Sequence, residues 1–217
     1  MPEILTEIEA RVVGSLIEKQ LTTPEYYPLT LNALVAACNQ KTNREPVVSY
    51  DEQTVQKALD DLREKNIAYV FYGSTSRVPK YKHILDKYLE LEPPETAVVC
   101  VLLLRSAQTL GELRERTGRL YEFSGLGEVQ ETLDNLARRE EPLIVKLERL
   151  PGQKEVRYAH LLSGKVIVSA NQSPEKSFSP NQSKDERTAK LEEDLENLRS
   201  EFNSFRQSFE DFRKQFE

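Results

Sequence analysis

Val55-Gln-Lys-Ala-Leu-Asp-Asp-Leu62 decides the fold, because the same pattern returns as Val129-Gln-Glu-Thr-Leu-Asp-Asn-Leu136. In both stretches the apolar residues follow steps of four and three, which places them on one face of a helix. Two further helical patterns precede each stretch, and two β-prone runs separated by a turn follow it. The order helix, helix, helix, hairpin therefore occurs twice, which indicates an internal repeat.

The first copy carries the clearest local signals. The predicted elements are helices within residues 5–16 and 29–38, a helix that carries the 55–62 stripe, and strands over 67–72 and 77–84. Thr6 with Glu9, and Ser49 with Glu52, have the spacing of capping boxes, which predicts a helix start at each place.

The second copy repeats these elements at nearly constant offsets. They are a helix over 95–104, a helix beginning near Thr109, the helix of the 129–136 stripe, and strands over 143–149 and 155–162. The hairpins even end alike, with Tyr81-Lys82-His83 matching Tyr158-Ala159-His160. Only the first copy contains two insertions, residues 22–28 and 39–48, which suggests that the copies have diverged in role.

Three helices followed by a two-stranded hairpin are typical of the winged helix, a variant of helix-turn-helix. We therefore predict a mainly α (α+β) fold with tandem winged-helix domains over residues 1–87 and 88–163. Residues 164–185, rich in Ser, Asn, Gln and Pro, are predicted to form a flexible linker. Residues 186–217 are predicted to form a C-terminal coiled-coil helix.

The coiled-coil prediction rests on apolar residues that alternate at steps of four and three. They are Leu191, Leu195, Leu198, Phe202, Phe205, Phe209, Phe212 and Phe216. We expect this seam to join copies of the chain into a homo-oligomer or to dock on another protein. The alternative is that the helix packs back on the chain's own body.

Composition limits the partners. The chain has 217 residues, 38% hydrophobic content and a net charge of −6, so a nucleic-acid site would have to be a local basic patch. No basic region followed by an apolar segment opens the sequence, and the longest apolar run, residues 97–104, is too short to cross a bilayer. These features predict a cytoplasmic protein with no membrane partner.

The sequence offers little catalytic chemistry. Cys38 and Cys100 lie inside apolar helical patterns, where a thiol is usually a small buried hydrophobe. With His83 and His160 as its only histidines, the chain has no four-ligand zinc spacing. It also lacks a Gly-rich phosphate loop and a nucleophile elbow. We predict a protein that is not an enzyme and that holds no cofactor or metal.

The inserted stretch 39–48 and the first hairpin supply the candidate site. The predicted contacts to double-stranded DNA are Lys41, Asn43, Arg44, Arg77, Lys80 and Lys82. The third helix argues against this interpretation, because its outward residues Asp60, Asp61 and Glu64 are acidic. Two alternatives therefore stay open: a DNA-binding regulator, and a protein-interaction scaffold in which stretch 39–48 is a structural loop.

Several motifs along the chain form a distinctive set. They are Glu18-Lys19-Gln20, Thr22-Thr23-Pro24-Glu25, Tyr27-Pro28-Leu29, Asn32-Ala33-Leu34, Ala37-Cys38-Asn39-Gln40-Lys41-Thr42-Asn43-Arg44-Glu45-Pro46-Val47, Leu103-Leu104-Arg105-x-Ala107-Gln108-Thr109-x-Gly111-Glu112-Leu113-Arg114 and Tyr121-Glu122-Phe123-Ser124. Together they resemble the YceH-like family of uncharacterised bacterial proteins. The resemblance covers about residues 4–162. It implies a tandem winged-helix fold in a bacterial cytosol, often with a coiled-coil-like tail, and it implies no activity, cofactor or catalytic residue.

Overall fold

The computed structural model describes residues 5–72, 78–149 and 154–164. The chain divides into two compact units, Met1–Ser169 and Ala170–Glu217, and every described residue belongs to the first. The predicted linker beyond Gly164, the predicted coiled-coil helix and all of its seam residues lie outside the described part. So does Arg77.

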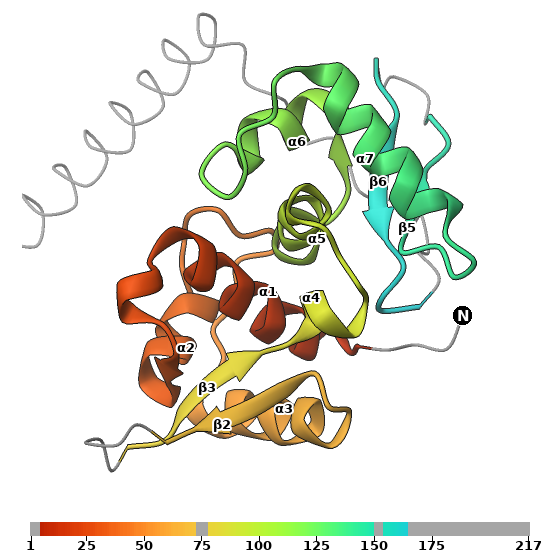
Figure 1. Cartoon of the computed structure of the whole chain (residues 1–217). Helices are drawn as coiled ribbons and strands as arrows, with labels where there is room; N and C mark the ends of the chain where they lie inside the picture. Colours follow the sequence, from red (N-terminus) through yellow and green to blue (C-terminus); the bar gives the residue numbers. More distant parts are fainter. Residues whose placement is uncertain (1–4, 73–77, 150–153, 165–217) are drawn as a thin grey trace, which may run out of the picture. The chain divides into compact units, whose positions relative to one another are not determined.

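The described unit is a mixed α+β structure in which both copies have the same order of elements, apart from a 3-10 helix and a short α-helix that occur in the first copy (Figure 1). The first copy contains α1 (Glu7–Thr22), the 3-10 helix η1 (Pro24–Tyr26), β1 (Leu29–Thr30), α2 (Leu31–Cys38), α3 (Glu52–Glu64), β2 (Ala68–Phe71), β3 (Lys80–His83) and α4 (Leu85–Tyr88). The second contains α5 (Pro93–Arg105), β4 (Gln108–Thr109), α6 (Leu110–Thr117), α7 (Leu126–Arg138), β5 (Ile144–Lys146) and β6 (Arg157–His160).

Each copy has a small antiparallel sheet, with strand orders β1-β3-β2 and β4-β6-β5. The sequence predicted the hairpins but missed the short strands β1 and β4, which pair Leu29 with Tyr81 and Gln108 with Tyr158. Two-residue strands are too short to show alternation in a sequence, so only their tertiary partners define them. Helix α4 was also missed.

The stretch that decided the fold plays the same part in both copies. Val55, Leu59 and Leu62 are completely buried, and their counterparts in α7 are buried to the same degree. The polar residues match as well: Tyr81 donates a hydrogen bond to Gln56 (3.1 Å), as Tyr158 does to Gln130 (3.2 Å). The third helix of each copy is thereby fastened to its own hairpin.

One predicted helix start was right and one was wrong. Thr6 and Glu9 form a reciprocal capping box at the start of α1, as predicted. Helix α3, however, is capped by Asp51, whose carboxylate accepts a hydrogen bond from the Thr54 amide (2.7 Å), and not by Ser49. Asp is as good an N-cap as Ser, so the sequence pattern alone could not separate the two positions.

Helix α5 lies in the middle of the unit, where it contacts α1, α6, α7 and β6 (Figure 1). Its residues from Glu95 to Leu104 are all buried, which explains why this segment is apolar on every side. A β-carbon at Gly14 of α1 would lie 3.0 Å from the Leu104 side chain, so α1 and α5 approach closely at that glycine. The predicted boundary between residues 87 and 88 falls within α4 and stays a prediction, because one compact unit holds both copies.

Within the described ranges, no helix combines the length and the apolarity that crossing a bilayer requires.

Candidate functional site

The inserted stretch 39–48 is closed by a single amide side chain. Asn39 follows the end of α2, and its side-chain nitrogen donates to the Tyr50 carbonyl oxygen (2.7 Å). Its side-chain oxygen accepts from the Tyr50 amide (2.8 Å). Asn39 thus links the two ends of the stretch through a pair of hydrogen bonds, one donated and one accepted by its side chain, as two paired residues in a β-sheet are linked.

Arg44 is the centre of the stretch, and its side chain is fully buried. The guanidinium donates to both carboxylate oxygens of Glu18 on α1, at 3.0 and 2.6 Å, and also to the Ala37 and Asn43 carbonyl oxygens. Burial acts to raise the pKa of Glu18, but the hydrogen bonds and charge of Arg44 bring that pKa below its usual value. Arg44, predicted as a DNA contact, is therefore engaged inside the protein.

A second buried arginine supports the same stretch. Arg11 of α1 donates to the Cys38 carbonyl oxygen (3.2 Å) and to the Pro46 carbonyl oxygen (2.5 Å). Burial lowers the pKa of Arg11, and the nearby charge of Arg44 lowers it further. We call Arg11, Glu18 and Arg44 the arginine bracket, because together they fix the loop to α1.

The stretch also contacts the second copy. The Glu45 amide donates to the Leu104 carbonyl oxygen (2.9 Å), and the Ser106 hydroxyl donates to the Glu45 carbonyl oxygen (3.1 Å). Arg105 donates a hydrogen bond to the Asn43 side chain. Of the three predicted contacts in this stretch, Asn43 and Arg44 therefore have partners within the protein, whereas Lys41 is exposed.

The outer face of the first sheet gathers a different set of residues. Tyr69 and Phe71 alternate with inward-facing residues along β2, and both are exposed. Directly opposite them on β3 lie Lys82 and Lys80, respectively. The Lys82 ammonium lies 6.0 Å from the centre of the Tyr69 ring, within reach of a cation–π interaction. We call these four residues the aromatic–lysine face.

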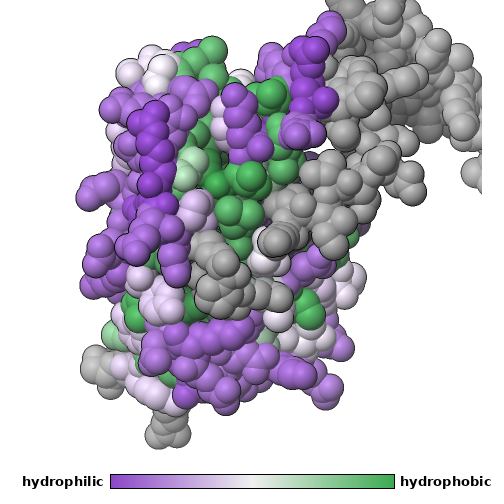
Figure 2. Space-filling model, turned by 90° about the vertical axis from the view of Figure 1, so that its right-hand side faces the viewer, coloured by the Kyte–Doolittle hydropathy of each residue, from purple (hydrophilic) through white to green (hydrophobic). Residues whose placement is uncertain are grey.

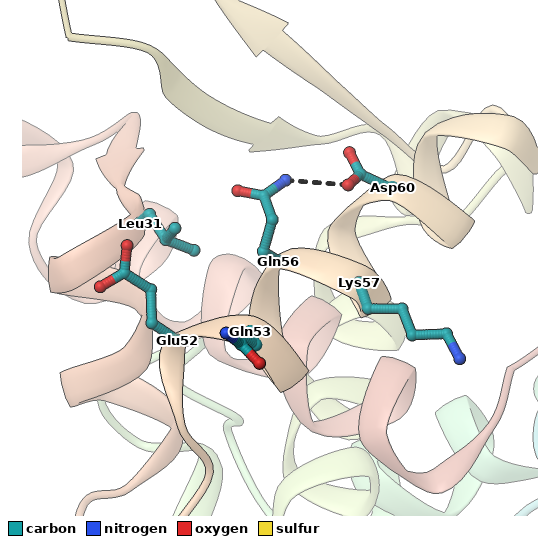
Figure 3. A pocket seen from close by; sticks show the side chains of 6 residues that line it. All are labelled: Leu31, Glu52, Gln53, Gln56, Lys57 and Asp60. Atoms are coloured by element: carbon teal, nitrogen blue, oxygen red, sulfur yellow. Dashed lines mark hydrogen bonds between the residues drawn. The ribbon is translucent and has the colours of Figure 1, made fainter.

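Helix α3 has the opposite charge character. An open hollow of about 640 Å³ beside it is lined by Leu31, Glu52, Gln53, Gln56, Lys57 and Asp60 (Figure 3). Gln56 donates to the Asp60 carboxylate (3.1 Å), and Arg63 pairs with the other oxygen of the same group (3.0 Å). The helix that would read a DNA groove in a winged helix therefore presents carboxylates.

Of the remaining titratable candidates, Cys38, Cys100 and His83 are buried, and His160 is half-buried. Burial raises the pKa of Cys38 to about 11, and it also raises the pKa of Cys100, so both thiols stay protonated near neutral pH. Burial lowers the pKa of His83 and of His160 to about 4. Among the described residues, no group of three or more His, Cys, Asp or Glu side chains is arranged to hold a metal ion.

Sequence reasoning missed four residues that shape these sites. Tyr69 and Phe71 could have been found from their two-residue spacing in a β-prone run, opposite two lysines at the same spacing. Arg11 and Glu18 are seven positions apart, so they share one face of α1, and Arg11 lies between the apolar residues Ala10 and Val12. Charged residues at such positions signal a buried ion pair.

These features define a class: a two-copy α+β protein whose copies share one sheet order and whose first copy carries a buried arginine bracket and an aromatic–lysine face. The chain belongs to the family described as "Protein of unknown function, DUF480", which matches residues 5–153.

Its relatives match over most of their length. A UPF0502 protein of Opitutus terrae is 52% identical over 197 residues, which cover 90% of this chain and 84% of that protein. A UPF0502 protein of Pelobacter propionicus is 51% identical over 202 residues and 92% of each chain. The UPF0502 protein YceH of Escherichia fergusonii is 51% identical over 172 residues, which cover 77% of this chain and 80% of that protein. The predicted resemblance to the YceH-like family is confirmed.

Proposed function

We propose that this chain is a non-enzymatic nucleic-acid-binding protein built from two winged-helix copies, and that it acts as a regulator. The arrangement of α1, α2, α3 and the β1-β3-β2 sheet supports a winged helix, in which the β2–β3 hairpin is the wing. The α5, α6, α7 and β4-β6-β5 arrangement supports a second one.

The observation that carries the proposal is the position of Lys80 and Lys82. Both side chains lie on the outer face of the first sheet, and within the described ranges neither forms an ion pair. Unpaired ammonium groups on one face release counterions when they meet phosphates, which is the main source of sequence-independent affinity. We therefore assign the contact to the wing.

Helix α3 does not take the usual role of a recognition helix in this proposal. Its outward carboxylates, including Glu52, Asp61 and Glu64, repel phosphate, and Lys57 only partly offsets them. The same carboxylates favour the alternative function, a protein-interaction scaffold, because the hollow beside α3 (Figure 3) suits a basic segment of a partner protein.

The test is anisotropy of full-length protein with labelled nucleic acid at low and near-physiological salt. We expect Lys80→Ala combined with Lys82→Ala to weaken binding and to reduce the slope of log K against log salt by about 0.7 for each lysine on a single strand and about 0.9 on a duplex. Lys146→Ala with Lys154→Ala is the matched control, because it removes two exposed charges from the second hairpin region. Equal binding by the two double variants, or no binding at low salt, would refute the proposal.

A further inference from the structure

Resting on the proposed function, we infer that the aromatic–lysine face binds single-stranded nucleic acid, with unpaired bases stacked on Tyr69 and Phe71 and the flanking phosphates beside Lys80 and Lys82. The class of ligand follows from the combination of exposed rings and cations, because bases offer a π-face and phosphates a negative charge.

The first observation is that the rings of Tyr69 and Phe71 are exposed to solvent. Tyr69 and Phe71 leave 36% and 45% of their surface open to solvent, although aromatic residues usually bury most of theirs. They point to one face of the sheet, since they are two residues apart on a strand. Neither ring forms a ring–ring contact with a described residue. Two adjacent rings are therefore open to a flat ligand.

Spacing favours a single strand over a duplex. Residues two apart on a strand are separated by about 7 Å, whereas successive bases stacked in one strand of a duplex rise only about 3.4 Å. Two bases that stack on these two rings must therefore be unstacked from each other. A single strand can extend in this way, but duplex bases are paired and stacked inside the helix.

The register of β2 on β3 places a positively charged side chain beside each ring. Each ring lies directly opposite a lysine, Tyr69 opposite Lys82 and Phe71 opposite Lys80, so a base on either ring has a cation beside its phosphate. The pairs repeat along the sheet in the direction that an extended strand would follow. A positively charged track with aromatic platforms is the usual design of surfaces that bind single strands without reading their sequence.

The second copy provides an internal comparison. The register places Val145 and Leu147 at the positions of the two rings, and Ala159 and Arg157 at the positions of Lys82 and Lys80. Arg157 is engaged with the Ala107 carbonyl oxygen (2.9 Å) and the Glu112 carboxylate (3.6 Å). Figure 2 shows an apolar area among hydrophilic side chains on the side of the second copy where β5 and β6 lie. Among the described residues, the second copy therefore has no counterpart of the aromatic–lysine face.

The test compares full-length protein and its variants on four labelled probes of the same length, about 12 nucleotides. The probes are single-stranded DNA, single-stranded RNA, duplex DNA and a DNA strand with its central bases removed. We expect the single strands to bind more tightly than the duplex and the abasic strand, and the comparison of DNA with RNA shows which strand is preferred.

Ring removal is the decisive variant. Tyr69→Ala or Phe71→Ala should weaken single-strand binding about 5- to 150-fold each, whereas Tyr69→Phe should retain it. Tyr69→Leu with Phe71→Leu keeps apolar side chains on the sheet and should still lose binding, which separates loss of stacking from loss of fold. Tyr88→Ala, at an exposed ring on α4, is the control and should bind as the unaltered protein does.

The experiment distinguishes failure of the stacking inference from failure of the proposed function. Ring variants that bind normally, or an abasic strand that binds as well as the intact one, overturn the stacking inference. If the lysine variants still lose binding in that case, the proposed function survives. Absence of binding to every probe at low salt overturns both and leaves a protein partner as the explanation of the exposed rings.

Discussion

Replacing Arg44 with alanine should cost far more stability than replacing an exposed arginine. The substitution removes both hydrogen bonds to the Glu18 carboxylate and the two that Arg44 donates to the Ala37 carbonyl oxygen. Of its ion-pair partners in the described part, the Glu18 carboxylate would keep only Lys19, at 3.6 Å, and its side chain is 14% exposed. Breaking a buried ion pair by removing one partner costs about 3–5 kcal/mol, because the other charge is left without compensation.

Urea unfolding followed by circular dichroism measures this cost. A loss of that size corresponds to a midpoint shift of at least about 1 M, for m values of about 1–3 kcal/mol per M. The matched control is Arg63→Ala, which breaks the ion pair with Asp60. In that pair the side chain of Arg63 is 46% exposed and that of Asp60 is 50% exposed. Exposed pairs contribute about 0.2–1 kcal/mol, so the control should unfold almost as the unaltered protein does.

The pH dependence gives a second check. The folded-state pKa of Glu18 is lowered. Its contribution to the stability of the fold is therefore complete above the unfolded-state pKa and is lost as the pH falls through the folded-state pKa. In the Arg44→Ala variant the buried carboxylate lacks its partner, and burial raises its pKa instead. The difference in the free energy of unfolding between the unaltered protein and the Arg44→Ala variant should therefore become smaller as the pH falls from 7 to about 4.

Two results would refute this reasoning. One is an Arg44→Ala variant that unfolds at the same urea concentration as Arg63→Ala. The other is a Glu18→Gln, Arg44→Ala double variant whose loss equals the sum of the single losses, since residues of one ion pair must be coupled. Either result would mean that the arginine bracket does not hold stretch 39–48.

Three further predictions follow from other parts of the chain. Gly14→Val should lower the melting temperature, because a side chain there meets α5 within 3.1 Å and overpacking costs about 1–3 kcal/mol, whereas Gly127→Ala, with nothing within 4 Å, should stabilise α7 by about 0.5–1 kcal/mol. Unchanged melting of Gly14→Val would contradict the close helix crossing. Because the folded-state pKa of His83 and of His160 is about 4, NMR titration should show both imidazoles neutral at pH 5.5, and stability should fall between about pH 6.5 and pH 4 as the unfolded chain takes up protons. A midpoint near pH 6.5 for either imidazole would show that it is not buried. In light scattering, the full-length protein should have the mass of several subunits, whereas a chain truncated after Leu162 should have fewer subunits; equal subunit numbers for the two would contradict the predicted role of the tail.

Much of the fold could be predicted because the decisive stretch is governed by local chemistry. The 55–62 and 129–136 patterns give helix faces directly. The Gln and Asp within them make the same bonds in both copies, because each Gln accepts from its hairpin tyrosine and donates to the Asp four residues later. Where two local signals competed, the prediction failed. Asp51 and Ser49 are both good caps, and the structure uses Asp51.

The candidate site was harder to predict, because it depends on contacts between distant residues. Arg44 has the chemistry of a phosphate ligand, and nothing within stretch 39–48 indicates that Glu18, 26 positions earlier, accepts its hydrogen bonds. Lys80 and Lys82 have the same chemistry and lie on a sheet face with no such acceptor in the described part. Sequence identifies the cations of a chain, but the partner of each cation decides which ones are available to a ligand.

The charge balance limits how nucleic acid can be held. A net charge of −6 opposes phosphate at long range, and Lys80 and Lys82 together can neutralise only two phosphates. Two contacts to a single strand imply a slope of only about −1.4 in log K against log salt. Counterion release from two phosphates therefore cannot supply the whole affinity at physiological salt. If the first sheet binds nucleic acid there, most of the affinity must come from stacking on Tyr69 and Phe71, which salt screens weakly. A steep salt dependence would instead require cations beyond this face, and Lys41, exposed on the inserted stretch, is the first to substitute.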